Sequence, residues 1–385
     1  MKLLILLISI IMLQLPGRVS MAAVPEITAE HAVLIEAVSG RVLFEKKAEE
    51  RAYPASLTKM LTCLLALEKG SLDDTLTISN EAAATEDAFM GFAPGDQISM
   101  RDALMGLMLV SDNSAAVAIA ESVGGSRAEF AEMMNERAKE MGAFQSHFVT
   151  PNGLPHPDHY STARDIAIIA AGCWQNNTYR DIVGRMDQQV RWIYPSNKAI
   201  NLKNTNKLLW SFDGANGMKT GWTQQAGGCL AASASRNGIN LIAIVLDSST
   251  VETRFTDAQL LLDYGFSIVK RSKGVDKART EKRILVTGGE DFSVTAHPAE
   301  DIFFPVLSGE SSADYTLNYS VPLTVKAPVS KGQRVGSIAI MYKGQELRRV
   351  SILADNTVHD GLHPVSLFLG LLDKIADMIR IALGR

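Results

Sequence analysis

The chain has 385 residues, of which 46% are hydrophobic and 21% charged, a usage typical of globular proteins that excludes disordered, collagen-like and polytopic membrane chains. Its 38 basic and 42 acidic residues give a net charge of -4, so no basic surface is expected to hold nucleic acid. At roughly 100–200 residues per domain, the length predicts two domains.

The N-terminus has the pattern of a secretory signal peptide. Lys2 precedes an apolar run at residues 3–13, and the small-x-small site Ser20-Met21-Ala22 follows. The run is shorter than the roughly 20 residues that cross a bilayer, although a membrane anchor or a buried strand is the alternative. We expect residues 1–22 to be removed and the mature protein to act outside the cytoplasm.

The next part of the chain predicts a mixed α/β domain. Residues 31–38 and 41–45 flank a Gly-containing turn, which predicts a hairpin. Residues 56–68, rich in Leu, Met and Ala and ended by Gly70, predict a mostly buried helix. Further helices are predicted at 101–110, 114–123, 127–141, 162–174 and 252–269, and two adjacent buried strands at 227–234 and 239–245. This order of strands and helices indicates layered α/β structure.

From about residue 275 the pattern changes to short β-rich runs separated by Gly, Pro and Ser. The runs, which indicate a small all-β module, lie at 284–286, 302–306, 315–325, 337–342 and 347–353. The charged segment 270–283 is expected to be a linker. We therefore expect an α/β domain over residues 23–275 and a β domain over residues 276–358.

The last segment, 359–385, contains a predicted amphipathic helix over 364–385 with a wide apolar face. Charged residues in its middle argue against a membrane span. In an exported protein, such a helix is expected to lie in the membrane interface. Docking onto its own domain or onto a dimer partner is the alternative.

The Ser-x-x-Lys motif at 56–59 places a hydroxyl and an amine on one face at the start of a predicted helix. A serine hydroxyl is a poor nucleophile until a base takes its proton, and a desolvated lysine can be neutral enough to do so. The helix N-terminus adds backbone N–H groups and a positive dipole end. Alone the motif is weak, because residues 267–270 repeat it.

Two further motifs follow in order. The Ser-Asp-Asn motif at 111–113 could pass a proton and orient a carbonyl, although these residue types are also favoured helix N-caps. The Lys-Thr-Gly motif at 219–221, shortly before a strand, could hold a carboxylate beside a strand edge, and a solvated turn is the alternative. Only the set that begins at Ser56 has all three elements in sequence, a combination found in class A β-lactamases and penicillin-binding proteins.

At these motifs the chain resembles the low-molecular-mass penicillin-binding proteins that are serine-type D-alanyl-D-alanine carboxypeptidases, the S11 peptidase group. The resemblance runs from about Ala32 to Leu383. It covers Tyr53-Pro-Ala-Ser-Leu-Thr-Lys59, Ser111-Asp-Asn-Ser-Ala-Ala116, Thr150-Pro-Asn-Gly-Leu154, His159 to Asp165, Asn204-Thr-Asn206, Gly217-Met-Lys-Thr-Gly221, and Ala327-Pro-Val329 with Gly332 and Gly336. It implies an acyl-serine transferase (β-lactamase-like) α/β domain, a small all-β domain and a membrane-associating helix over 359–385.

The resemblance also implies roles for individual residues. The catalytic group would be Ser56 as acylated nucleophile, Lys59 as its general base, and Ser111 with Asn113 as the proton-relay and positioning pair. The substrate-binding group would be Lys219, Thr220, Gly221 and Trp222, with Lys219 on the terminal carboxylate and the backbone N–H groups of Ser56 and Trp222 as oxyanion hole. The family's position after Lys-Thr-Gly varies, so Trp222 bears on substrate preference.

The implied reaction releases D-alanine from pentapeptide stems of peptidoglycan, and water then frees the enzyme. The implied partners are peptidoglycan stem peptides, β-lactam antibiotics as acylating inhibitors, and a membrane surface contacted by the C-terminal helix. No cofactor and no metal are expected. The implied location is the cell envelope, at the outer face of the cytoplasmic membrane.

The same residues bear on other classes of protein. A class A β-lactamase needs a glutamate between the second and third motifs, and no Glu occurs from Met141 to Val251, so hydrolysis of acylated β-lactams should be slow. A D,D-endopeptidase uses the same catalytic set and stays open. A silent wall-binding scaffold, a Ser-His-Asp hydrolase and a metal enzyme built on His156, Asp158 and His159 are less favoured.

The three cysteines, Cys63, Cys173 and Cys229, are too scattered for a disulfide framework or a zinc site. Each has apolar sequence neighbours. We therefore expect buried free thiols, with a single disulfide as the alternative.

Overall fold

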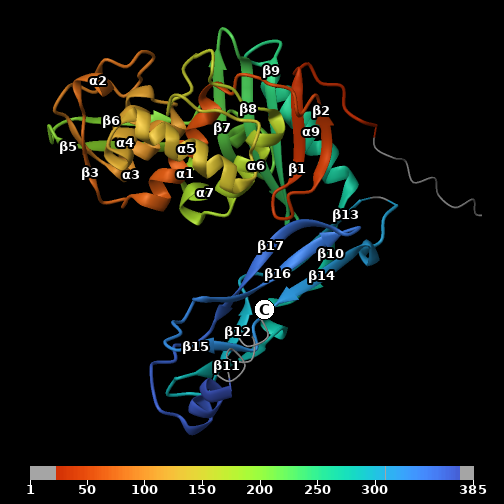
Figure 1. Ribbon diagram of the computed structural model, residues 1–385. Coiled ribbons are helices and arrows are strands. Elements are labelled where there is room, and N and C mark those ends of the chain that lie inside the picture. Colours follow the sequence, from red (N-terminus) through yellow and green to blue (C-terminus); the bar gives the residue numbers. More distant parts are fainter. Residues whose placement is uncertain (1–22, 308, 373–385) are drawn as a thin grey trace, which may run out of the picture.

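The structure is a computed structural model that describes residues 23–307 and 309–372. The expected signal peptide and the last part of the amphipathic helix, residues 373–385, lie outside the described residues. The chain folds into a larger α/β body and an elongated β body that extends away from it (Figure 1). The α/β body is built by residues up to Ile268, and the β body begins at Val269.

A five-stranded antiparallel sheet is the centre of the α/β domain. Its strand order is β2-β1-β9-β8-β7, so β7 is an edge strand. The strands are β1 (His31–Glu36), β2 (Val42–Lys46), β7 (Ala215–Thr223), β8 (Gly227–Arg236) and β9 (Ile239–Ser248). The predicted hairpin and the predicted neighbouring strands β8 and β9 are confirmed.

Both faces of this sheet are buried, which explains the continuous apolar runs in β8 and β9. Along β9, Leu241, Ala243 and Val245 face a core that includes α9 (Thr253–Ile268). The alternate residues, among them Ile242 and Ile244, face the core formed with α1 (Lys59–Lys69) and α6 (Ala163–Trp174). The period of two that defines a strand therefore assigns successive residues to opposite cores.

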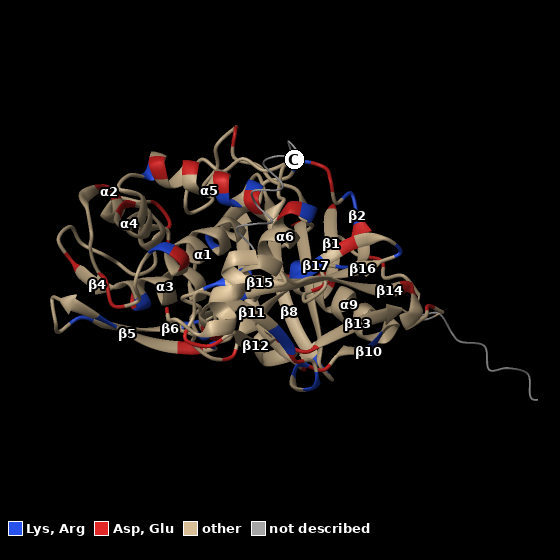
Figure 2. Ribbon diagram, turned by 60° about the horizontal axis from the view of Figure 1, so that its bottom comes forward, with Lys and Arg blue, Asp and Glu red and all other residues tan. Residues whose placement is uncertain are grey.

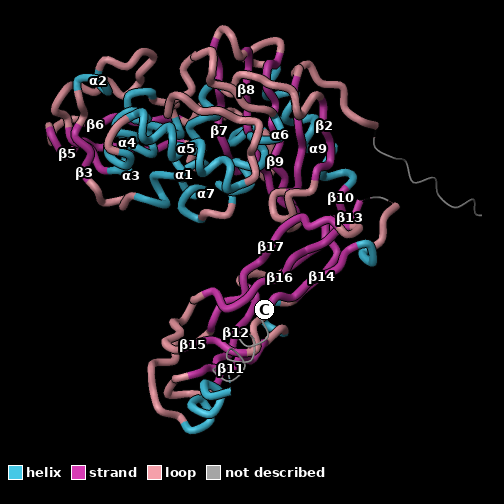
Figure 3. Tube along the Cα trace, viewed as in Figure 1, coloured by secondary structure: helices cyan, strands magenta, loops and turns pink. Residues whose placement is uncertain are grey.

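A helical lobe lies beside the sheet and is clearly separated from the β domain (Figure 3). The predicted helices are confirmed as α3 (Met100–Leu109), α4 (Asn113–Gly124), α5 (Arg127–Met141), α6 and α9. Side chains of Ser99, Asp112, Ser126 and Thr162 cap the first four of these. Helix α5 carries acidic and basic residues along its length, as expected of an outer helix (Figure 2).

Several short elements in the lobe were not predicted, because each is too short to show a hydrophobic period. They are a four-stranded sheet of β3 (Thr75–Thr77), β4 (Gln97–Ser99), β5 (Asp187–Tyr194) and β6 (Ala199–Lys203), with α2 (Asn80–Ala83), α7 (Asn177–Val183) and α8 (Leu208–Ser211).

The β domain contains eight strands among the described residues. They are β10 (Val269–Val275), β11 (Lys282–Thr287), β12 (Ser293–Pro298), β13 (Ile302–Leu307), β14 (Tyr315–Ser320), β15 (Thr324–Lys326), β16 (Arg334–Tyr342) and β17 (Gln345–Ala354). β10 pairs with β13, and the other six form one sheet in the order β14-β16-β17-β12-β11-β15.

The linker expected at 270–283 is wrong. Residues 269–275 form β10, which pairs with β13, so the first strand of the β domain follows α9 without an intervening linker. The charges of this segment lie on exposed positions of a two-stranded ribbon. A charged strand in a two-stranded ribbon and a charged linker can have the same amino-acid composition. The composition of this segment therefore did not distinguish β10 from a linker.

The two domains meet around the turn between β1 and β2. There the Arg41 guanidinium donates to both carboxylate oxygens of Glu310, at 2.7 and 2.5 Å, to the Pro305 carbonyl at 2.9 Å, and to the Tyr315 hydroxyl. It also lies over the Tyr342 ring at 4.1 Å from the centroid. The hydrogen bond from Arg41 lowers the pKa of Glu310 to about 2. A charged pair thus joins the domains.

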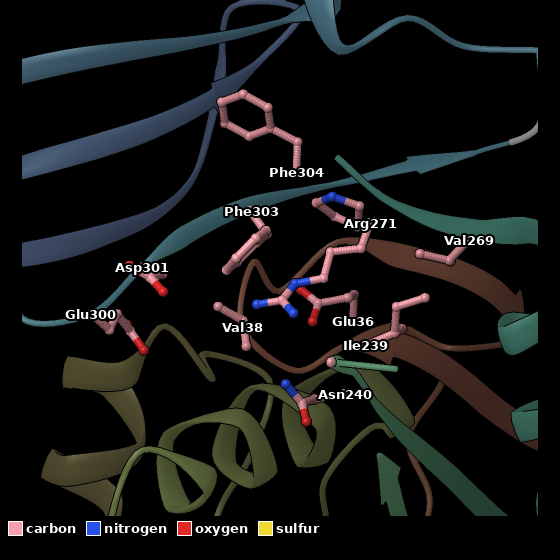
Figure 4. Close-up of a pocket in the computed structure, with 12 residues that line it drawn as sticks. Glu36, Val38, Ile239, Asn240, Val269, Arg271, Glu300, Asp301, Phe303 and Phe304 are labelled. Carbon is pink, nitrogen blue, oxygen red and sulfur yellow. The ribbon is translucent and has the colours of Figure 1, made fainter. Parts of the chain in front are cut away.

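A small cavity of about 140 Å³ lies on the other side of this turn, between the domains (Figure 4). Glu36 and Val38 line it from the α/β domain, and Arg271 and Phe303 from the β domain. The Glu36 carboxylate accepts two hydrogen bonds from Ser39, each 2.7 Å long, while its burial raises its pKa. These hydrogen bonds fix the conformation of the turn that carries Arg41.

The far end of the β domain carries helical residues 364–372 (Figure 1). The Ser366 hydroxyl accepts a hydrogen bond of 2.7 Å from the Gly289 backbone N–H and fastens this segment to the domain. Within the described ranges, no helix is long and apolar enough to cross a membrane.

We expect Arg41→Met to lower the free energy of unfolding by about 3 kcal/mol, because Glu310 keeps its charge in a mostly buried place without its partner. Urea denaturation measures the change. The double variant Arg41→Met/Glu310→Gln is the control and should recover part of the loss, since both charges are then absent. An Arg41→Met protein as stable as the wild type would contradict this account of the junction.

Candidate active site

Ser56 lies in a short 3-10 helix, η1 (Ala55–Thr58), that leads directly into α1. The predicted helix over 56–68 is thus divided, with the serine before the α-helical part. Ala55 has φ +48°, an uncommon value for a residue with a side chain. A Cβ at Gly153 would lie 2.0 Å from the Ala55 carbonyl oxygen, so only glycine allows the 150–154 loop to pack here. The loop and turn together hold Ser56 at the site.

Lys59 is fully buried, and its amine donates three hydrogen bonds. They reach the Ser56 Oγ at 2.9 Å, the Asn113 Oδ1 at 2.7 Å and the Asn152 carbonyl oxygen at 2.7 Å. Three segments that are distant in the sequence therefore meet at one amine. The predicted pair of Ser56 and Lys59 lies within hydrogen-bond distance, as general base catalysis requires.

Burial lowers the pKa of Lys59 to about 7, because removing the ammonium from water disfavours the charged form. The carboxylates of Asp112 and Asp87 oppose this shift. An amine with a pKa near neutrality can both accept and return a proton at physiological pH.

The Ser-Asp-Asn motif forms the connection between α3 and α4. Asp112, rather than Ser111 or Asn113, is the N-cap, and its carboxylate accepts from the Ala115 N–H at 2.6 Å. Ser111 has φ +63°, a strained value for a serine at the end of α3. Asn113 spans the site, since its Oδ1 accepts from Lys59 and its Nδ2 donates to the Glu86 carbonyl at 2.9 Å. Asp112 therefore caps α4, whereas Asn113 contacts Lys59.

The Lys-Thr-Gly motif lies shortly before β8, as expected, but residues 219–221 are themselves part of the edge strand β7 rather than of a turn. Lys219 is 1% exposed, and its amine donates to the Thr220 carbonyl at 2.8 Å. Burial, with Lys59 and Arg254 nearby, moves the pKa of Lys219 well below its ordinary value. The Thr220 hydroxyl lies 2.6 Å from that of Thr205. The absence of a long apolar run had hidden this strand.

Gly221 faces the nucleophile. A Cβ at this position would lie 3.1 Å from the Ser56 backbone nitrogen, so glycine keeps the space beside Ser56 open. The next side chain, Trp222, is 55% exposed. Because alternate residues of a strand share a face, Trp222 is on the same side of β7 as Thr220. Contacts thus join Ser56, Lys59 and Asn113 around the start of α1, and Gly221 of β7 lies beside the Ser56 backbone nitrogen.

Arg254, on α9, was missed. Its guanidinium donates to the Gly221 carbonyl at 2.6 Å and is mostly buried beneath β7. The signal that could have identified Arg254 is its position on the buried face of a predicted helix, because a buried charged side chain needs a partner. Asn152 was missed for a different reason, since it contributes a backbone oxygen and any residue type supplies one.

His159 supports the site rather than forming a metal centre. Its Nδ1 accepts from the Val149 N–H at 3.1 Å, so Nε2 carries the proton and donates to Thr58 Oγ1 at 2.9 Å. Burial lowers the pKa of His159 to about 4, so the ring is neutral. Nowhere in the described part of the chain do three His, Cys, Asp or Glu side chains form a group suited to a metal ion.

The three cysteines are free and buried, as predicted. Burial raises the pKa of Cys63, Cys173 and Cys229, which keeps each as a thiol at neutral pH.

Comparisons with known proteins identify the family of the chain. The family model of D-alanyl-D-alanine carboxypeptidases, peptidase S11, matches residues 18–250, and that of the penicillin-binding protein 5 C-terminal domain matches residues 269–360. Carboxypeptidase DacF of Bacillus subtilis is 33% identical over 331 residues, 85% of each chain. DacA of Escherichia coli K12 is 30% identical over 373 residues, 93% of this chain and 88% of its own.

Solved structures give the same result. Penicillin-binding protein 5 of Haemophilus influenzae is 32% identical, with a TM-score of 0.65 over 88% of this chain and 99% of its own. A variant of the Streptomyces K15 DD-transpeptidase is 32% identical, with a TM-score of 0.60 over 63% of this chain and all of its own. The chain therefore belongs to the peptidase S11 family of D-alanyl-D-alanine carboxypeptidases and carries a C-terminal domain of the penicillin-binding protein 5 type.

Proposed function

We propose that Ser56 is the acylated nucleophile of this carboxypeptidase and Lys59 its general base. The observation that carries the proposal is the fully buried Lys59 amine, with a pKa near 7, at 2.9 Å from the Ser56 hydroxyl. The remaining hydrogen bonds of Lys59 fix its direction, so the amine points at the group that must lose a proton. This combination activates a serine without a histidine or a metal.

In the proposed reaction, Lys59 accepts the Ser56 proton while Oγ bonds to the carbonyl carbon of the penultimate D-alanine. The carbon–nitrogen bond to the terminal D-alanine then breaks, and the leaving nitrogen takes a proton through Lys59 and Ser111. The backbone N–H groups of Ser56 and Trp222 stabilise the oxyanion. Water then cleaves the Ser56 ester, restores the hydroxyl and releases the shortened stem as a carboxylate.

The terminal carboxylate of the stem is proposed to lie at the Lys-Thr-Gly motif. The Lys219 amine, the Thr220 hydroxyl and the Arg254 guanidinium lie around the edge of β7 and supply hydrogen-bond donors for an anion. An extended stem can add to the free edge of β7, where Gly221 provides room beside Ser56. This binding mode favours a substrate that ends in a free carboxylate.

β-Lactam antibiotics are proposed to acylate Ser56 by the same attack. No Glu between Met141 and Val251 is present to activate water on that ester. The acyl-enzyme formed by a β-lactam should therefore persist.

Export and membrane attachment complete the proposal. Residues 1–22 would direct export, after which the C-terminal helix holds the enzyme at the outer face of the cytoplasmic membrane. The exposed side of helical residues 364–372 supports this role because it is apolar, with Leu367, Phe368, Leu371 and Leu372 each 45–59% exposed. We place the domain limit between residues 268 and 269 rather than between 275 and 276, because β10 pairs with β13, and the two domains then separate catalysis from attachment.

Mass spectrometry of muropeptides tests the reaction. We expect the mature protein to remove one terminal alanine from pentapeptide stems and Ser56→Ala to remove none, because no other serine contacts Lys59 Nζ among the described residues. Cleavage of cross-links with intact pentapeptides would replace the carboxypeptidase assignment by an endopeptidase. No change in either substrate would contradict both.

The acylation rate should depend on pH through Lys59. The amine must be neutral to accept a proton, so the rate should rise about tenfold per pH unit below pH 7 and level off above it. Stopped-flow acylation by a fluorescent penicillin between pH 5 and 9 measures this. A flat profile over that range would argue against Lys59 as the base.

Removal of residues 364–385 should release the mature protein from membranes and leave its rate on soluble peptides unchanged, since the site is built entirely by the α/β domain. Sedimentation with phospholipid vesicles measures attachment. The substitution Ser366→Ala, which keeps the apolar face, is the control. Equal sedimentation of truncated and intact protein would refute attachment through this helix.

A further inference from the structure

A loop beside the active site has no role in the mechanism above. Residues 84–91 connect α2 to the segment before β4 and lie against α4, at the end of the α/β domain away from the β domain (Figure 1). The loop is fixed to the Ser-Asp-Asn motif: the Asp112 carboxylate accepts from the backbone N–H groups of Phe89 and Met90, at 2.5 and 2.6 Å. Asn113 donates to the Glu86 carbonyl at 2.9 Å.

Asp87 is the unused group in this loop. Its side chain is exposed, and no hydrogen bond or ion pair holds it anywhere in the described ranges. Its φ is +52°, a left-handed value that aspartate and asparagine tolerate better than most residues. The carboxylate is near enough to Lys59 to raise that amine's pKa against the effect of burial. The other anion that acts on Lys59, Asp112, is occupied by the loop and by α4.

The surroundings leave Asp87 available to a ligand. Phe89, two residues on, is 61% exposed and provides an apolar surface in the same loop. Lys198, a cation that contacts the end of this loop, donates to the Gly91 carbonyl at 2.6 Å and pairs with Asp96 at 2.8 Å. That lysine is therefore already neutralised and does not compete for Asp87.

We propose that Asp87 is a specificity-determining residue that receives the side-chain ammonium of the diamino acid preceding the attacked D-alanine. The inference rests on the proposed nucleophile Ser56. The residue before the attacked one is about 3.4 Å further along an extended stem, and in this arrangement its long side chain extends toward the loop, which Asn113 holds beside Lys59. Phe89 contacts the aliphatic part of that side chain.

This assignment has a consequence for substrate choice. In a cross-linked stem the same amine is acylated and neutral, so it loses the attraction to Asp87. The enzyme then prefers stems whose amine is free, which favours carboxypeptidase action on un-cross-linked wall over action on stems already joined.

Two synthetic pentapeptides ending in D-Ala-D-Ala test the proposal, one with lysine at position three and one with Nε-acetyl-lysine. We expect the wild type to prefer the free amine by about threefold in kcat/KM, mostly through KM, and the preference to fall at high salt. Asp87→Asn keeps the left-handed backbone and should abolish the preference by slowing only the lysine peptide. Asp87→Gly should do the same.

Glu86→Gln is the matched control, since it removes one exposed carboxylate from the same loop and should keep the preference. Acylation by penicillin, which lacks the amine, is measured at pH 9, where Lys59 is neutral in every variant, and equal rates there show that Ser56 and Lys59 are intact. A preference that survives in both Asp87 variants, or a wild type that cleaves both peptides equally, would overturn the assignment. A wild type that acylates with penicillin but cleaves neither peptide would overturn the proposed function and this inference with it.

Discussion

The active site depends on keeping one lysine amine out of water. Burial disfavours the charge on Lys59, and the fold offsets the loss of hydration with three acceptors from three distant segments. Much of the local structure serves that geometry. The strained backbone at Ala55 and Ser111, the close approach of Gly153 and the neutral ring of His159 all position one of those acceptors or the helix that carries the amine. Such strain persists only where surrounding contacts enforce it.

The second constraint is the free edge of β7. An edge strand normally invites unwanted pairing, and here the edge is bounded by the turn that carries Ser56 and by the exposed indole of Trp222. Below the strand, the Lys219 amine and the Arg254 guanidinium donate to backbone carbonyls, and the guanidinium contributes positive potential. An anionic chain end is the ligand that this potential favours.

At the domain junction, by contrast, the buried charges are paired. Arg41 is surrounded by Glu310, an aromatic face and a backbone carbonyl, so its burial is compensated in full. α9 bears Arg254 near its beginning and runs directly into β10 at its end. The catalytic strand and the β domain are thus connected through one helix rather than through a flexible linker.

Local signals in the sequence determined the helices, the β1–β2 hairpin, the β8–β9 pair and the three motifs, because helix periods, turn residues and catalytic spacings act over a few residues. The tertiary structure determined the features that these local signals do not predict. It made β7 a strand despite its Gly-rich, charged sequence, turned the charged segment after α9 into β10, and brought Arg254 and the Asn152 carbonyl to the site. Strand pairing, backbone acceptors and the burial that lowers the pKa of Lys59 arise from contacts between distant segments, and no local pattern encodes them.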